Sequence, residues 1–147
     1  MNSQGVLKMT GTRLLTVPAF ALVVFLAPHA SAQDATDLVG HWTGTISEPR
    51  SEDFPTYTLS VHLGLDNHGA AVGIVDYSAF PCAGVWTNAT NNGSTWRFEE
   101  TITDGTTVCA EHGVIELTPG SGGIDVRLWP VGYESSPSTG RLVRRSP

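Results

Sequence analysis

The chain has 147 residues, of which 40% are hydrophobic and 15% charged, and its formal net charge is −6 at neutral pH. All fourteen acidic residues follow residue 33, where they face six arginines and no lysine, so this part carries a charge of −8. Such a surface repels phosphate backbones and anionic lipid headgroups, and we expect no nucleic-acid partner.

The N-terminus has the three parts of a secretory signal peptide. In chain order these are the basic residues Lys8 and Arg13, the apolar run 14–26, and the small residues Ala30 and Ala32. The apolar run is too short to span a bilayer, which takes roughly 20 residues. We expect a signal peptide over 1–32, cleavage near Ala32, and one secreted or periplasmic domain over 33–147 without a membrane span. The alternative for this apolar run is a buried N-terminal helix.

After the signal peptide, short runs of β-forming residues alternate with turn residues every 10–15 positions, which is typical of a sandwich or barrel. The predicted strands are 40–47, 56–63, 70–77, 84–89, 95–102, 113–118, 123–129 and 139–144. No helical periodicity is found between them.

Three of these strands alternate cleanly between apolar and polar residues, which assigns their faces. The side chains expected to point inward are Tyr57, Leu59, Val61 and Leu63, then Trp96, Phe98, Glu100 and Ile102, then Ile124, Val126 and Leu128. Short Gly- and Asn-rich turns at 66–69, 91–93 and 120–123 join neighbouring strands. The predicted fold is an all-β, antiparallel up-and-down meander of about eight strands that closes or nearly closes into a small barrel.

Cys82 and Cys109 are the two cysteines of the chain. Export into an oxidising compartment makes a disulfide the expected state of such a pair. The alternative is a reactive thiol beside His112, which requires both cysteines to stay reduced outside the cytoplasm.

Gly40-His41-Trp42 on the first predicted strand resembles the G-x-W motif of the calycins, the lipocalin, avidin and fatty-acid-binding group. That resemblance implies a barrel with one end closed by an arginine over the tryptophan. It places Arg141, on the last strand, in the role of that arginine.

A second resemblance covers most of the exported part. It is to a small bacterial β domain found in exported proteins and also appended to serine/threonine kinases. The matching features are G-x-W-x-G-T from Gly40, Tyr77 with Cys82 and Gly84, Glu100-Thr101-Ile102 with Gly105 and Cys109, Gly113 to Leu117, Trp129, and Arg141 to Arg144. This resemblance implies an extracytoplasmic sensing or accessory role and brings no catalytic residue set.

Glu100 is an acidic residue at an inward position, where an unpaired carboxylate is costly. The favoured interpretation is a buried structural pair with Arg141 or a backbone donor. The alternatives are a polar anchor for a ligand inside the barrel, a general acid, and a break in the strand register.

The histidines and tryptophans give weaker signals. His41, His62, His68 and His112 are expected on the surface and show no metal-site spacing. Trp42 and Trp96 are expected in the core or barrel floor. Trp129 is out of phase with its apolar neighbours and is expected to be an exposed residue of a recognition patch or of a cover over one barrel end.

The function favoured by these residues is non-catalytic binding or sensing outside the cytoplasm, of a small molecule in the barrel or of a protein partner on its rim. The candidate ligand-binding residues are Glu100, Trp42, Tyr57, Trp96 and Arg141. We expect no catalytic residues, no metal and no cofactor, and a monomer. The alternative function is a secreted hydrolase inhibitor or a cell-envelope accessory protein that acts through its surface loops. The partner is then an envelope or extracellular protein.

Overall fold

The computed structural model describes residues 34–146, so the predicted signal peptide and its cleavage site lie outside the described residues. One short 3-10 helix, η1 (Ala35–Leu38), precedes eight strands. The strands are β1 (Gly40–Ser47), β2 (Thr56–Leu65), β3 (Ala71–Tyr77), β4 (Cys82–Asn91), β5 (Trp96–Asp104), β6 (His112–Gly120), β7 (Gly123–Pro130) and β8 (Ser138–Arg144).

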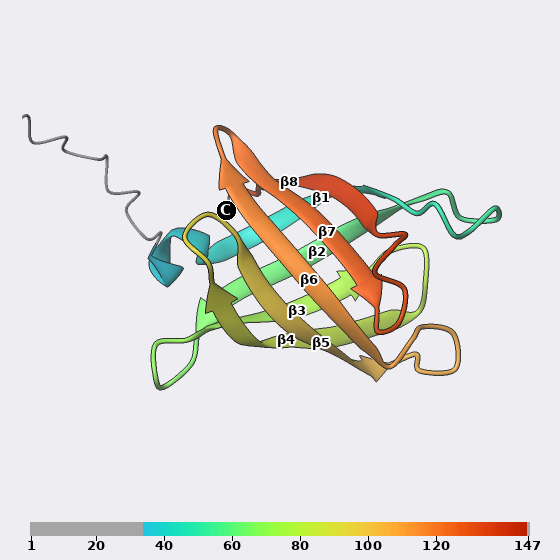
Figure 1. The fold of residues 1–147 in the computed structure, drawn as a ribbon, viewed down its shortest axis with the longest axis horizontal. Helices are drawn as coiled ribbons and strands as arrows, with labels where there is room; N and C mark the ends of the chain where they lie inside the picture. Colours follow the sequence, from blue (N-terminus) through green and yellow to red (C-terminus); the bar gives the residue numbers. More distant parts are fainter. Residues whose placement is uncertain (1–33, 147) are drawn as a thin grey trace, which may run out of the picture.

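The strands form a closed antiparallel barrel in which each strand pairs with its neighbours in sequence, and β8 pairs with β1 (Figure 1). This confirms the predicted fold class. The β1–β8 seam needs glycine because the two backbones approach closely. A Cβ atom on Gly44 would collide with the carbonyl group of Arg141, and one on Gly140 would collide with that of Thr45.

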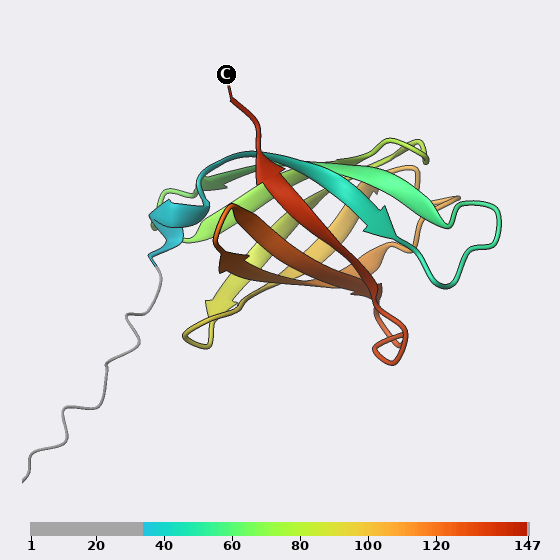
Figure 2. The same cartoon turned by 90° about the horizontal axis from the view of Figure 1, so that it is seen from above.

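The two ends of the barrel differ (Figures 1 and 2). One end, here called the mouth, carries the β1–β2, β3–β4, β5–β6 and β7–β8 loops. The other, the closed end, carries η1 and the three remaining turns. A functional pocket in a meander barrel is expected at an end, because side chains fill the middle.

The middle of the barrel is packed with apolar side chains. The fully buried ones are Ile46, Leu59, Val61, Val75, Trp86, Phe98, Ile115, Leu117, Ile124, Val126 and Leu142. The predicted inward faces of β2, β5 and β7 are confirmed, including Glu100, which is 7% exposed. Trp42 and Trp96 also belong to the core, as predicted.

An arginine does cover Trp42 at the closed end, but it is Arg144 and not Arg141. The Arg144 guanidinium lies 4.4 Å from the Trp42 ring centroid and donates to the carbonyl oxygens of Val39 and Asp37. The Trp42 indole donates to the carbonyl oxygen of Leu38 at 2.7 Å. Leu38 is itself buried, so η1 and the arginine together close this end.

The phase of β8 explains this correction. Leu142 is fully buried while Val143 is 49% exposed, so the side chains two residues from Leu142 share its inward side. Arg144 therefore reaches Trp42, and Arg141 lies on the outer surface. There Arg141 donates to Asp125 and to the carbonyl oxygen of Ser121. The expected pairing of Arg141 with Glu100 was wrong for the same reason.

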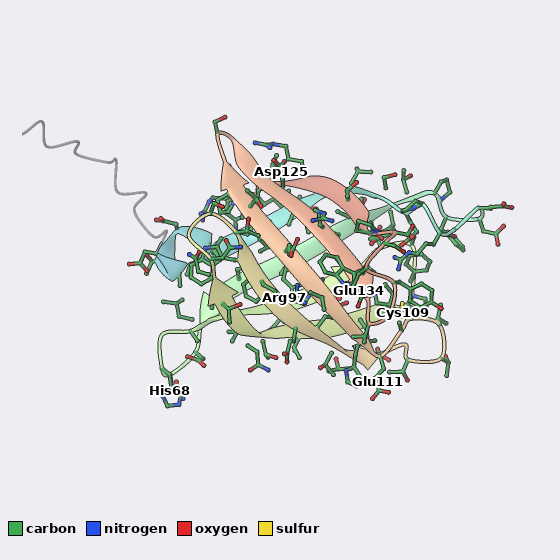
Figure 3. The ribbon with its side chains drawn as sticks, in the orientation of Figure 1. His68, Arg97, Cys109, Glu111, Asp125 and Glu134 are labelled. Atoms are coloured by element: carbon green, nitrogen blue, oxygen red, sulfur yellow. A yellow bond between two sulfur atoms is a disulfide. The ribbon has the colours of Figure 1, made fainter. Side chains whose placement is uncertain are left out.

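Cys82 and Cys109 form the predicted disulfide, with their Cα atoms 6.4 Å apart. It ties the first residue of β4 to the β5–β6 loop at the mouth, where Figure 3 labels Cys109. A disulfide fits an extracellular or periplasmic protein. Within residues 34–146, no helix has the length and apolar character that crossing a membrane requires.

Candidate functional site

A half-open cavity of about 160 Å³ lies at the mouth of the barrel. Its lower walls come from the ends of the strands, with Tyr57, Tyr77, Glu100, Ile102 and Leu128. Its upper walls come from the loops: Glu48, Arg50, Phe80, Val108, Cys109 and Ala110, with His112, Gly113, Trp129 and Pro130 beside them. We call it the mouth pocket.

Glu100 is the buried acid of the mouth pocket. Its Oε1 accepts a hydrogen bond from the Tyr77 hydroxyl and another, at 2.9 Å, from the Trp86 indole. Burial raises the pKa of Glu100, and these two donors offset only part of that effect. Burial and the neighbouring Glu100 also raise the pKa of Tyr77, which keeps its hydroxyl protonated as the donor.

The second carboxylate oxygen of Glu100, Oε2, is available to a ligand in the pocket. Among the described residues, both hydrogen bonds given to this side chain end on Oε1. Oε2 points toward Gly113, where an added Cβ would lie 2.8 Å from it. Gly113 and Glu100 both line the pocket, so the glycine keeps the space over Oε2 open.

Glu48 and Arg50, from the β1–β2 loop, form an ion pair at 2.7 Å at the upper wall of the pocket. Ser138 is fully buried and donates to Glu48 Oε2, while Arg50 donates to the Ser138 hydroxyl. Burial alone would raise the pKa of Glu48, but the hydrogen bonds from Arg50 and Ser138 outweigh it and lower that pKa. Burial raises the pKa of Tyr57, and the neighbouring carboxylates of Glu48 and Glu100 act in the same direction.

The apolar part of the mouth extends beyond the pocket. A shallower hollow of about 350 Å³ shares Glu48, Arg50, Phe80, Ala110 and Pro130 with it and continues to Tyr133. Around this hollow the loops expose apolar side chains. They are Phe54 at 45%, Val108 at 59%, Val131 at 62% and Tyr133 at 59% exposure. We call these four residues the apolar rim.

The structure places the five candidate ligand-binding residues in three different regions. Glu100 and Tyr57 line the mouth pocket. Trp42 lies at the closed end and Trp96 begins β5, which leaves the closed end toward the mouth. Arg141 lies on the outer wall. Of the five candidates, only Glu100 and Tyr57 line the mouth pocket.

Sequence reasoning missed Tyr77 and Trp86 as partners of Glu100, and Glu48 and Arg50 as pocket residues. The inward position of Tyr77 could have been predicted from the sequence, because Tyr77 lies two residues after the buried Val75 on β3. The sequence gives no indication that Glu48 and Arg50 line a pocket, since a polar pair in a loop is ordinarily exposed.

Trp129 lies on the outer wall but is not exposed as predicted. Its side chain is only 5% exposed, because the guanidinium groups of Arg97 and Arg127 lie 5.7 and 5.6 Å from its ring. Glu116 pairs with both arginines and holds them in place. Figure 3 shows Arg97 on this wall.

The histidines do not cluster at the mouth pocket. Among the described residues, His112 is the one histidine that lines it. His41 and His62 stack across β1 and β2 with ring centroids 3.9 Å apart. In residues 34–146, no group of three or more His, Cys, Asp and Glu side chains is arranged to hold a metal ion.

Comparison of the chain with protein-family models, with curated proteins and with solved structures found no match. The eight-stranded antiparallel barrel is nonetheless compatible with a calycin-like barrel.

Proposed function

We propose that this chain is a non-catalytic binding module that works outside the cytoplasm and takes one end of a small amphipathic molecule in its mouth pocket. The observation that carries this proposal is Glu100 Oε2. It is a buried acceptor left without a protein donor among the described residues, in a pocket with largely apolar walls. Pockets with apolar walls and a few fixed polar groups are typical ligand sites.

Catalysis is disfavoured although two carboxylates line the pocket. Glu48 accepts from Arg50 on both of its oxygens and from Ser138 on one, so neither oxygen is free to act as a base or nucleophile. Glu100 alone lacks the second, differently tuned acid or base that hydrolytic chemistry requires.

The proposed location rests on two features. The disulfide needs an oxidising compartment to form and persist. The predicted signal peptide supplies a route of export. A sensing role like that implied by the resemblance to kinase-appended domains is compatible with a pocket of this kind.

A titration of the ¹⁵N-labelled protein with 2-phenylethanol, followed by NMR, tests the proposal. We expect saturable shifts at Ile102, Gly113 and Leu128 and none at the Trp42 indole. Gly113→Ala should weaken binding about tenfold, because the new Cβ would crowd Glu100 Oε2. The matched control is Gly64→Ala, whose Cβ would meet nothing within 4 Å.

Shifts confined to the closed end, or equal binding by the two alanine variants, would contradict the proposal. The remaining candidate is then a hydrolase inhibitor or envelope accessory protein that binds through the apolar rim. The exposure of these four apolar side chains on three of the loops favours that function. Phe54→Ser and Val131→Ser should abolish rim binding and leave 2-phenylethanol binding unchanged, since neither residue lines the mouth pocket or the hollow beside it.

A further inference from the structure

The charges around the mouth pocket leave one acid without a compensating cation. Glu48 and Arg50 form an ion pair and cancel each other. His112, at the edge, lies 3.9 Å from Glu111, which is outside the pocket lining. Glu100 receives only the neutral donors Tyr77 and Trp86. A ligand that supplies positive charge therefore fits this site best.

The geometry of Glu100 selects the kind of cation. A guanidinium group binds a carboxylate through two parallel hydrogen bonds and needs both oxygens. Oε1 is already occupied by Tyr77 and Trp86, so only Oε2 is available. An ammonium group is a compact point charge that a single oxygen can bind. A carboxylate ligand would meet a second negative charge in a buried place.

The walls of the pocket suit the rest of such a ligand. Three aromatic residues line the pocket together with Glu100: Tyr57, Tyr77 and Phe80. Aromatic faces attract an ammonium group, and more strongly when water is excluded. Burial raises the pKa of Glu100, and an ammonium group at Oε2 would favour its ionised form.

The size of the pocket limits how much of the ligand enters. At about 160 Å³ it is smaller than the roughly 300 Å³ at which drug-sized sites begin. An ammonium group and a short stem fill it, and the remainder of the ligand would lie in the adjoining 350 Å³ hollow.

We infer that the mouth pocket binds a primary ammonium group carried on an apolar stem, with Glu100 Oε2 as its acceptor. This inference rests on the proposed function, since it names the ligand class of the same pocket. The ammonium group has two sources, a small amine or a lysine side chain of a polypeptide, and both share this chemistry.

Three probes of matched shape test the inference: 2-phenylethylammonium, 2-phenylethanol and 3-phenylpropanoate. We expect the ammonium to bind wild-type protein at least about tenfold more tightly than the alcohol, because a charged hydrogen bond replaces a neutral one. The carboxylate should leave the pocket resonances unchanged. Glu100→Gln should remove the preference for the ammonium and keep alcohol binding within about twofold.

Glu99→Gln is the matched control, since it makes the same charge change on the neighbouring residue. Glu99 is exposed on the outer face and bonds Asn88. This variant should keep the ammonium preference. The wild-type comparison of the three probes decides the matter even when Glu100→Gln fails to fold.

Equal binding of ammonium and alcohol would overturn the inference while leaving the pocket as a binding site. No shift at pocket residues with any probe would overturn the proposed function itself. A blocked Gly-Lys-Gly tripeptide and its acetylated-lysine counterpart separate the sources. Tighter binding of the lysine peptide than of the small amine points to a polypeptide, and the reverse order points to a small molecule. Either order supports the ammonium.

Discussion

At the scale of single residues, two glutamates in one pocket have opposite electrostatic environments. Glu48 is held by a guanidinium group and a buried serine hydroxyl, which lower its pKa. Glu100 is buried against neutral donors, and its pKa is raised. The ordinary value for both in an unfolded chain is about 4.5. They therefore affect stability with opposite dependence on pH.

Glu100→Gln tests this difference. A carboxyl whose pKa is raised on folding contributes stability below its unfolded pKa and loses it as pH rises through the folded value. The free energy of unfolding of Glu100→Gln, relative to wild type, should therefore increase as the pH rises above the unfolded pKa of about 4.5. Urea unfolding at several pH values measures this.

Glu48→Gln should show the opposite trend. A lowered pKa contributes stability that is present above the unfolded pKa and lost as pH falls through the folded value. The variant should lose most, relative to wild type, at the high end of the range. A difference from wild type that does not change with pH, in either variant, would contradict these assignments.

At the scale of elements, the closed end depends on contacts between the first and last elements of the domain. Arg144 of β8 covers Trp42 of β1 and donates to backbone carbonyls before that strand. Arg141 is only three residues away, yet it makes an exposed ion pair with Asp125. The two arginines are thus a matched pair with different expected effects.

Arg144→Met should lower the free energy of unfolding by about 1 kcal/mol, through the lost contact with Trp42 and the two carbonyl oxygens. Arg141→Met should change it by less than about 0.5 kcal/mol, since exposed ion pairs contribute little. Denaturant unfolding followed by tryptophan fluorescence measures both. Equal effects would mean that Arg144 does not secure the closed end.

At the scale of the whole molecule, the barrel is filled in the middle, closed at one end and hollowed at the other. The disulfide lies at the mouth, and Cys109 is part of the pocket wall. It therefore stabilises the fold and holds the β5–β6 loop beside the pocket.

Replacing Cys82 and Cys109 together by alanine should lower the free energy of unfolding by about 3–4 kcal/mol, because the bridge closes a loop of 27 residues. Wild-type protein unfolded with a reductant present should lose a similar amount. Unfolding curves that coincide with and without reductant would show that the bridge does not stabilise this domain.

The sequence by itself determined the eight strands, the inward faces of β2, β5 and β7, and the order of the barrel. Alternation of period two and short turns are local properties that need no knowledge of distant residues. The burial of Glu100 followed from the same alternation. The strand ends were predicted less closely than the strands themselves, since several strands extend one or two residues beyond their predicted limits.

Only the tertiary structure decided which side chains meet. Tyr77 reaches Glu100 across 23 residues of chain, and Arg144 rather than Arg141 reaches Trp42. The predicted members of one binding site, Trp42 and Glu100, proved to belong to opposite ends. Such contacts depend on the stagger of the strands around the closed barrel. They also depend on which residues of β8 point inward, and local alternation does not assign this because Leu142 and Val143 are both apolar.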